Sequence, residues 1–191
     1  MMTKQRERLG FQINMDRCIG CNACTISCKS FYQLEPKLNR RFISEVDEML
    51  TGTVKRCYIS TACNHCEEPS CAKACPTGAY TKLENGIVKH NQERCIGCKM
   101  CATACPYSVP QFDTIKRKVD KCSMCSDLLE VGEETICVSS CPMEAISIIN
   151  LNTINESEVV SEIKGFNDPS ITGSSTRFKL PLSTNVVWRE N

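Results

Sequence analysis

The sequence has few of the large side chains that usually fill a protein core. Aromatic residues are 6% of its 191 residues, and the hydrophobic share of 41% includes seventeen cysteines. A core with so small an apolar inventory needs another source of stability. The length has room for one domain or two small ones.

Other missing features argue against several protein classes. No stretch approaches the ~18 apolar residues of a membrane-spanning helix, so we expect no span in this chain. Residues 1–10 are polar and lack the apolar centre of a signal peptide, which predicts no secretory signal of its own. The net charge of +1 gives no broad basic surface for nucleic acid.

Cysteine, by contrast, is abundant. A content of 17 in 191 residues is typical of a disulfide scaffold or of a metal protein. The odd number, the regular spacing and the missing secretory signal count against disulfides. Sixteen of the cysteines fall into four runs, and Cys57 lies outside them.

The run at residues 95–106 has the spacing C-x2-C-x2-C-x3-C-P, which is typical of [4Fe–4S] ligands. Three closely spaced cysteines allow one loop to wrap three corners of a cube, and the fourth serves a neighbouring cluster. The run at 18–28 has the same spacing, with Lys29 in place of proline. Those at 63–76 and 122–142 are stretched, as C-x2-C-x4-C-x3-C-P and C-x2-C-x11-C-x3-C-P.

The four runs form an internal repeat. The first and third share Arg-Cys-Ile-Gly-Cys, and the second and fourth share the ending Cys-Pro-x-x-Ala. This alternation indicates a duplicated two-cluster ferredoxin unit, in which paired runs exchange their fourth cysteines. The spacing alone leaves the pairing open.

We prefer a nested pairing of run two with three and run one with four. A hairpin predicted over residues 79–90, with an Asn85-Gly86 turn, joins runs two and three compactly. Strands predicted over 10–15 and 145–151 would then lie side by side. Pairing one with two and three with four is the alternative, which the connector 106–121 does not forbid.

These patterns predict an α+β fold of two bacterial-ferredoxin-like units, related by a pseudo-two-fold and holding four [4Fe–4S] clusters. Residues 10–62 and 106–151 form the first unit, and 63–105 the second. Residues 29–62 are a hairpin insertion in the first unit. Residues 152–191 are an extended arm without a core of its own.

Finer expectations concern the connectors. The insertion has strands over 41–46 and 53–60, joined around Thr51-Gly52. Residues 114–120 are one strand, and the eleven residues between Cys125 and Cys137 are a loop.

Other interpretations remain. Sixteen thiolates could hold zinc, although zinc sites usually take two separate Cys pairs, and runs one and three space three cysteines evenly.

Cys57 is interpreted as a half-buried small side chain, and His65 as a structural residue near the surface that could tune a cluster. No nucleotide-binding glycine fingerprint, Ser/His/Asp signature or radical-enzyme run is present. An electron conductor is therefore favoured over a catalyst.

The arrangement resembles the four-cluster iron–sulfur subunit of molybdopterin oxidoreductases, the family of the DMSO reductase B subunit. The resemblance covers residues 10 to about 150 and is carried by the four runs together with residues 58–66 and 75–79. Residues 168–173 and Arg177-Phe178 are similar to the DMSO reductase branch. Lys29 and the extra Cys57 depart from the pattern without affecting a ligand.

The resemblance implies the nested pairing and four ligand sets. The implied sets are Cys18, Cys21, Cys24 and Cys141 for the first cluster; Cys28, Cys122, Cys125 and Cys137 for the second; Cys63, Cys66, Cys71 and Cys105 for the third; and Cys75, Cys95, Cys98 and Cys101 for the fourth. The first lies nearest a molybdopterin catalytic subunit and the fourth nearest a membrane anchor that oxidises quinol.

The implied function is to relay electrons through these clusters, from the anchor toward the reduction of an S- or N-oxide. The implied place is a peripheral position in a membrane complex of an anaerobically respiring prokaryote, on the cytoplasmic face or exported with a twin-arginine partner. The alternatives are an iron–sulfur subunit of a hydrogenase or formate dehydrogenase complex, a stand-alone polyferredoxin, or a zinc-binding scaffold.

Overall fold

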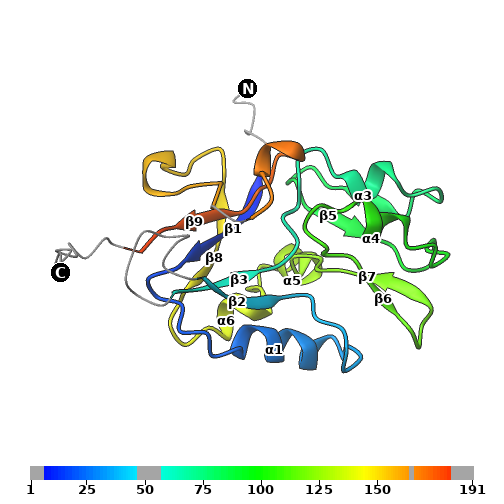
Figure 1. The fold of residues 1–191 in the computed structure, drawn as a ribbon, viewed down its shortest axis with the longest axis horizontal. Coiled ribbons are helices and arrows are strands. Elements are labelled where there is room, and N and C mark those ends of the chain that lie inside the picture. Colours follow the sequence, from blue (N-terminus) through cyan, green and yellow to red (C-terminus); the bar gives the residue numbers. More distant parts are fainter. Residues whose placement is uncertain (1–6, 47–56, 164–165, 182–191) are drawn as a thin grey trace, which may run out of the picture.

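A three-stranded sheet organises one end of the molecule. The computed structural model describes residues 7–46, 57–163 and 166–181. Strand β1 (Leu9–Asn14) is central, with β8 (Ile146–Asn150) antiparallel on one side and β9 (Arg177–Lys179) parallel on the other (Figure 1). The prediction that the two strands near 10–15 and 145–151 are neighbours is therefore confirmed.

Buried apolar residues alternate with polar residues along β1, and this explains its place in the core. Phe11, Ile13 and Met15 are buried, and the polar residues between them are partly exposed or exposed. The register places Ile13 opposite Ile146 of β8 and Phe178 of β9. The side chains of one face thus meet across all three strands.

Three antiparallel hairpins complete the strands. They are β2 (Phe42–Val46) with β3 (Cys57–Thr61), β4 (Tyr80–Lys82) with β5 (Val88–His90), and β6 (Gln111–Asp113) with β7 (Lys118–Asp120). Each cysteine run starts shortly after a strand, namely after β1, β3, β5 and β7. The strands therefore fix the points from which the cysteine loops begin.

The helices of the described residues are short, and four of the five contain cysteines of the runs. They are α1 (Ala23–Phe31), α3 (Ser70–Lys73), α4 (Met100–Ala104), α5 (Ser126–Glu130) and α6 (Ile136–Ser139). Helix α1 packs against α6, and α3 against α4. In Figure 1 the first pair lies below the sheet and the second lies at the opposite side of the molecule.

Two sequence-based predictions of secondary structure were wrong. Residues 114–120 are not one strand, because Asp113 Oδ1 accepts hydrogen bonds from the amides of Ile115 (2.9 Å) and Lys116 (2.8 Å) and turns the chain. Arg117 then adopts a positive φ of 54°, and β7 returns beside β6. The expected loop after Cys125 instead contains helix α5 and the start of α6.

The predicted insertion is described in part. Its two strands pair as β2 and β3, with Val46 opposite Cys57. Residues 53–56 of the expected second strand and the Thr51-Gly52 turn lie outside the described residues.

The arm at residues 152–181 packs on the rest of the chain. Within it are the 3-10 turns η1 (Glu156–Glu158) and η2 (Pro169–Ile171), and Val159, Ile163 and Phe178 are buried. Ile163 and Phe178 join a core cluster that also contains Phe11. The arm thus shares the common core.

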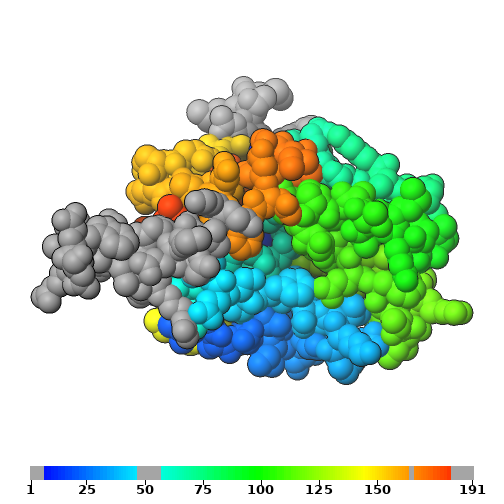
Figure 2. Space-filling view, in the orientation of Figure 1, coloured from blue at the N-terminus to red at the C-terminus, as the bar shows by residue number. Residues whose placement is uncertain are grey.

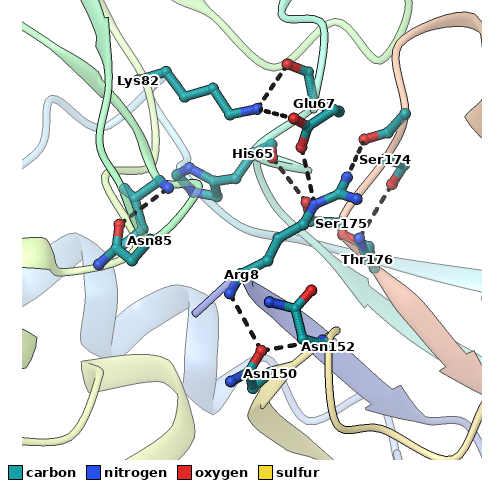
Figure 3. Close-up of polar contacts among 12 residues, drawn as sticks. Arg8, His65, Glu67, Lys82, Asn85, Asn150, Asn152, Ser174, Ser175 and Thr176 are labelled. Carbon is teal, nitrogen blue, oxygen red and sulfur yellow. Dashed lines mark hydrogen bonds and ion pairs between the residues drawn. The ribbon is translucent and has the colours of Figure 1, made fainter. Parts of the chain in front are cut away.

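Polar contacts fasten the arm to the second run (Figure 3). Ser175 Oγ donates to the carbonyl of His65 at 2.9 Å, and Thr176 Oγ1 donates to Asn64 Oδ1 at 2.8 Å. Arg8 donates to the carbonyl of Gly173 at 3.2 Å and forms an ion pair with Glu67. Figure 2 shows the orange atoms of the arm against the green atoms of the middle of the chain.

Replacing Phe178 by alanine should destabilise the protein strongly. The ring is 8% exposed and belongs to the core cluster that contains Phe11, so its removal should cost roughly 3–5 kcal/mol. Urea unfolding of the cluster-loaded protein, followed by circular dichroism, measures the cost. The control Ile171→Ala removes a side chain that is 61% exposed and should change little. Equal midpoints for the two variants would show that the arm does not stabilise the core.

Candidate iron–sulfur sites

Three of the four predicted cysteine sets each line one cavity. The cysteines lining them are Cys18, Cys21, Cys24 and Cys141 in the first; Cys28, Cys122, Cys125 and Cys137 in the second; and Cys63, Cys66, Cys71 and Cys105 in the third. Four sulfur donors around each cavity suit a similar occupant in each.

The fourth set is more open. Cys75 and Cys95 pack against a small core cluster that contains Cys101, and both influence the thiol of Cys101 electrostatically. Cys98 is exposed. Three of these four cysteines are therefore brought together, and the fourth lies at the surface of the molecule.

The loops of runs one and three share a backbone conformation. Gly20 and Asn22 have φ values of 71° and 62°, and the equivalent Gly97 and Lys99 have 72° and 64°. In the third run this turn lets the Gly97 amide donate to Cys95 Sγ at 3.4 Å. Residues with positive φ thus wrap the loop and direct its amides at sulfur.

The shared ending Cys-Pro-x-x-Ala has a structural reason. The amide of Ala79 donates to Cys75 Sγ at 3.4 Å, and that of Ala145 donates to Cys141 Sγ at 3.2 Å. Both alanines are almost fully buried, so a larger side chain would not fit there. Such hydrogen bonds to sulfur are among the factors that set the reduction potential of a cluster.

Helix α1 explains why the fourth cysteine of a run serves a different site. Cys24 and Cys28 lie one helical turn apart, about 6 Å along the axis, and both are buried. Cys24 lines the first cavity, and Cys28 lines the second. One helix therefore supplies a wall to two sites.

Burial keeps three of the thiols, those of Cys28, Cys71 and Cys122, neutral before a metal binds. Burial, and then the proximity of Cys122, raises the pKa of Cys28 to about 12. Burial and the neighbouring Cys63 raise the pKa of Cys71 to about 12 and that of Cys122 to about 11. Because metal ligands are thiolates, loading these sites releases protons.

The described residues contain no group of His, Cys, Asp or Glu side chains placed to hold a single metal ion. In a [4Fe–4S] cube each thiolate binds a different iron, so the ligands surround a space instead of meeting at one atom. The three cysteine-lined cavities fit this geometry.

Sequence reasoning missed several polar contacts to the cysteines. Thr172 Oγ1 of the arm donates to Cys66 Sγ at 3.1 Å, and Ser60 Oγ lies 3.4 Å from Cys24 Sγ. Lys121 Nζ lies 3.6 Å from Cys63 Sγ. The sequence carries no local signal for them, because the partners are 36 to 106 residues apart.

His65 and Cys57 are both buried. The expectation that His65 lies near the surface was wrong, because its side chain is fully buried and Nδ1 accepts a hydrogen bond from the Val88 amide at 3.0 Å. Burial, with the nearby charges of Lys121 and Arg41, holds its pKa well below the usual value, so the ring is neutral. Cys57 lies on β3 in the core, outside all three cysteine-lined cavities.

Strands that lead into cysteine loops, and cavities lined by four cysteines, define a ferredoxin-type iron–sulfur protein. Comparison with known families agrees. The model of the 4Fe–4S dicluster domain matches residues 54–151, and that of a 4Fe–4S binding domain matches residues 15–33. The protein therefore carries [4Fe–4S] clusters.

Several characterised proteins are similar over most of their length. The anaerobic dimethyl sulfoxide reductase B subunit of Escherichia coli (strain K12) is 40% identical over 145 residues, covering 72% of this chain and 71% of that one. The corresponding B subunit of Haemophilus influenzae is 37% identical, covering 78% and 77%. Thiosulfate reductase electron transfer subunit PhsB of Salmonella typhi is 37% identical, covering 75% and 74%. The protein belongs to the DMSO reductase B-subunit family of iron–sulfur proteins.

In the part of the sequence that the structure describes, no helix is long and apolar enough to cross a membrane.

Replacing Gly97 by alanine should remove one cluster. A Cβ atom at Gly97 would lie 2.3 Å from the carbonyl oxygen of Arg117, and the φ of 72° adds strain. We expect the variant to lose about four irons per molecule, measured by iron and sulfide analysis. Gly132→Ala is the control, because Gly132 also has a positive φ but open space around it. That variant should keep its iron and lose about 1–2 kcal/mol of stability. Full iron in the Gly97 variant would contradict the close packing of this loop.

Proposed function

We propose that this protein is the electron-transfer subunit of a molybdoenzyme complex and conducts electrons through four [4Fe–4S] clusters. The observation that carries the proposal is the placement of successive cysteine sets along shared helices, which puts their sites in series. The relatives named as reductase subunits support the type of complex. The clusters supply one-electron transfer, and the polypeptide supplies their spacing and surroundings.

The proposed ligand sets are the four implied by the nested pairing. Three of them coincide with the cysteine-lined cavities. For the fourth, the contacts of Cys101 with Cys75 and Cys95 are the support. Helix α1 packs against α6, and α3 packs against α4. In the proposed arrangement a pseudo-two-fold axis would exchange these two helix pairs.

The order of the sites follows from shared walls. Helix α1 joins the first and second sites through Cys24 and Cys28. Cys63 of the third set is the strongest electrostatic neighbour of Cys122 of the second, which brings these two sites together. Helix α3 carries Cys71 of the third set, and Cys75 of the fourth set follows two residues after its end. The proposed conductor therefore runs from the first set to the fourth.

Both ends of this conductor expose apolar side chains. Ile19, beside the first set, is 55% exposed, and Met143 is 37% exposed. Ile96 and Met100, within the fourth set's main run, are 67% and 50% exposed. Exposed apolar side chains at two separate places suit two docking partners. We assign the first end to a molybdopterin catalytic subunit and the second to a membrane anchor that oxidises quinol, so that the protein is a peripheral part of a membrane complex.

A second candidate is the corresponding subunit of a formate dehydrogenase. The formate dehydrogenase iron–sulfur subunit of Haemophilus influenzae is 32% identical, but the match covers only 49% of that protein. The partners that co-purify with the protein distinguish the two candidates.

Anaerobic purification should yield a protein with about sixteen irons and as many sulfides per molecule. Reduction with dithionite should produce low-temperature EPR signals of [4Fe–4S] clusters broadened by spin interaction, because the sites share walls. In the intact complex, quinol should reduce these clusters and the terminal acceptor should reoxidise them. Zinc in place of iron, or clusters that quinol never reduces in a complete complex, would reject the proposal.

A serine at Cys105 discriminates between the two pairings of the runs. In the nested arrangement Cys105→Ser should remove the same EPR signal as Cys71→Ser, with a loss of about four irons in each. In the alternative arrangement it should match Cys137→Ser. Cys57→Ser is the control and should retain all its iron, because Cys57 lies outside every proposed set.

A further inference from the structure

Two buried cations stand in the walls of two of the cysteine-lined cavities. Lys121 is 4% exposed and lines the cavity of Cys63, Cys66, Cys71 and Cys105. Arg41 is 2% exposed and lines the cavity of Cys28, Cys122, Cys125 and Cys137. Neither belongs to a cysteine run, and both lie among sulfur atoms.

Lys121 is held by carbonyl oxygens and sulfur. Its Nζ donates to the carbonyls of Val88 (2.5 Å) and Cys122 (2.8 Å) and lies 3.6 Å from Cys63 Sγ. Among the described residues no carboxylate forms an ion pair with it. It also acts electrostatically on Cys71 and Cys105 of the same cavity.

Arg41 is held in a similar way. Its Nη1 donates to the carbonyl and the hydroxyl of Ser60, both at 3.0 Å, and its guanidinium stacks 4.4 Å above the ring of Phe11. Its buried Nη2 has no hydrogen-bond partner in the described structure. Burial lowers the pKa of Arg41, but Cys137, Cys122 and Cys24, when they are thiolates, outweigh it and raise that pKa above its usual value.

A buried cation without a carboxylate is costly unless another negative charge lies close to it. Here the negative charge is that of the proposed cluster with its four thiolates. That charge grows when the cluster takes up an electron. A fixed cation in the wall therefore stabilises the reduced form more than the oxidised form, and low local dielectric strengthens the effect.

The wall of the first cavity offers a contrast. Its lining, apart from its four cysteines, contains only uncharged residues, such as Asn22, Ile43 and Met143. Arg40, in the wall of the second cavity, is neutralised by a bidentate contact with Asp120 at 2.6 and 2.8 Å. The buried cations that no carboxylate neutralises thus line the two inner sites of the proposed series, although Arg41 also acts on Cys24 of the first set, after Cys137 and Cys122 of the second.

We propose that Arg41 and Lys121 are fixed charges that raise the reduction potentials of the second and third clusters above the values that neutral walls would give. This inference rests on the proposed ligand sets. Reduction then means that each cluster accepts one electron. The inner clusters hold the electron between two partners that bind at the ends.

The test is a redox titration followed by EPR on the cluster-loaded complex, with dithionite as reductant. Lys121→Met removes the charge and keeps the length of the side chain. We expect its third cluster, identified by the signal lost in Cys71→Ser, to become at least tenfold harder to reduce, which equals ~59 mV for one electron. The other clusters should shift less. Lys121→Arg should restore a potential close to that of the unmodified protein.

Arg41→Met and Arg41→Lys form a parallel pair for the second cluster, identified by the signal lost in Cys137→Ser. Lys73→Met is the control, because Lys73 neighbours the third site on α3 but its side chain is 65% exposed and paired with Glu68. Unchanged midpoints in iron-complete Lys121→Met and Arg41→Met, or equal shifts in Lys73→Met, would overturn the inference.

The iron content of the neutral and charge-retaining variants is a second test of whether the charge or the shape of the side chain matters. If the neutral variants lose a cluster and the charge-retaining variants keep it, the charge is required at that site. If Lys121→Arg and Arg41→Lys lose the cluster as well, shape and not charge is what the site needs, and the inference is wrong. A wild-type protein without these EPR signals would instead reject the proposed function.

Discussion

The structure depends on the distance of one helical turn between two cysteines that face different cavities. Cys24 and Cys28 show this most directly, since both are buried on α1 and each lines its own site. In the proposed ligand sets, the same spacing at the end of every run links each site to its neighbour. The small apolar core is a result of this design, because sulfur-lined sites occupy positions that leucine and phenylalanine fill in other proteins.

Backbone amides supply several of the hydrogen bonds to sulfur around these sites. Left-handed residues such as Gly97 and buried alanines such as Ala145 direct N–H groups at sulfur in the runs. Two buried cations add to these amides: Arg41 comes from outside the runs, and Lys121, directly before the fourth run, lines the third cavity and lies 58 positions from Cys63. The surroundings of the sites therefore combine contacts that are local in sequence with contacts from other parts of the sequence.

That division explains what could be predicted from the sequence. Cysteine spacing and the Asn85-Gly86 turn are local, and they predict the clusters and the hairpin of β4 and β5 correctly. The turn at Asp113 was missed because a side chain competes with the strand pattern. The contacts of Thr172 with Cys66 and of Lys121 with Cys63 were missed because they join residues 106 and 58 positions apart. Such contacts depend on which distant segments the topology brings together, and the spacing of residues in the sequence does not reveal this.

The parallel pairing of β1 with β9 has a consequence for biosynthesis. The first strand of the described structure needs residues 146–150 and 177–179 as neighbours, so its partners are translated 133 to 165 positions after it. Thr172, which donates to Cys66, arrives at the same late stage. Contacts so distant in sequence form slowly. Until the arm docks, Cys66 therefore lacks the hydrogen bond from Thr172, and the third site is uncovered on that side.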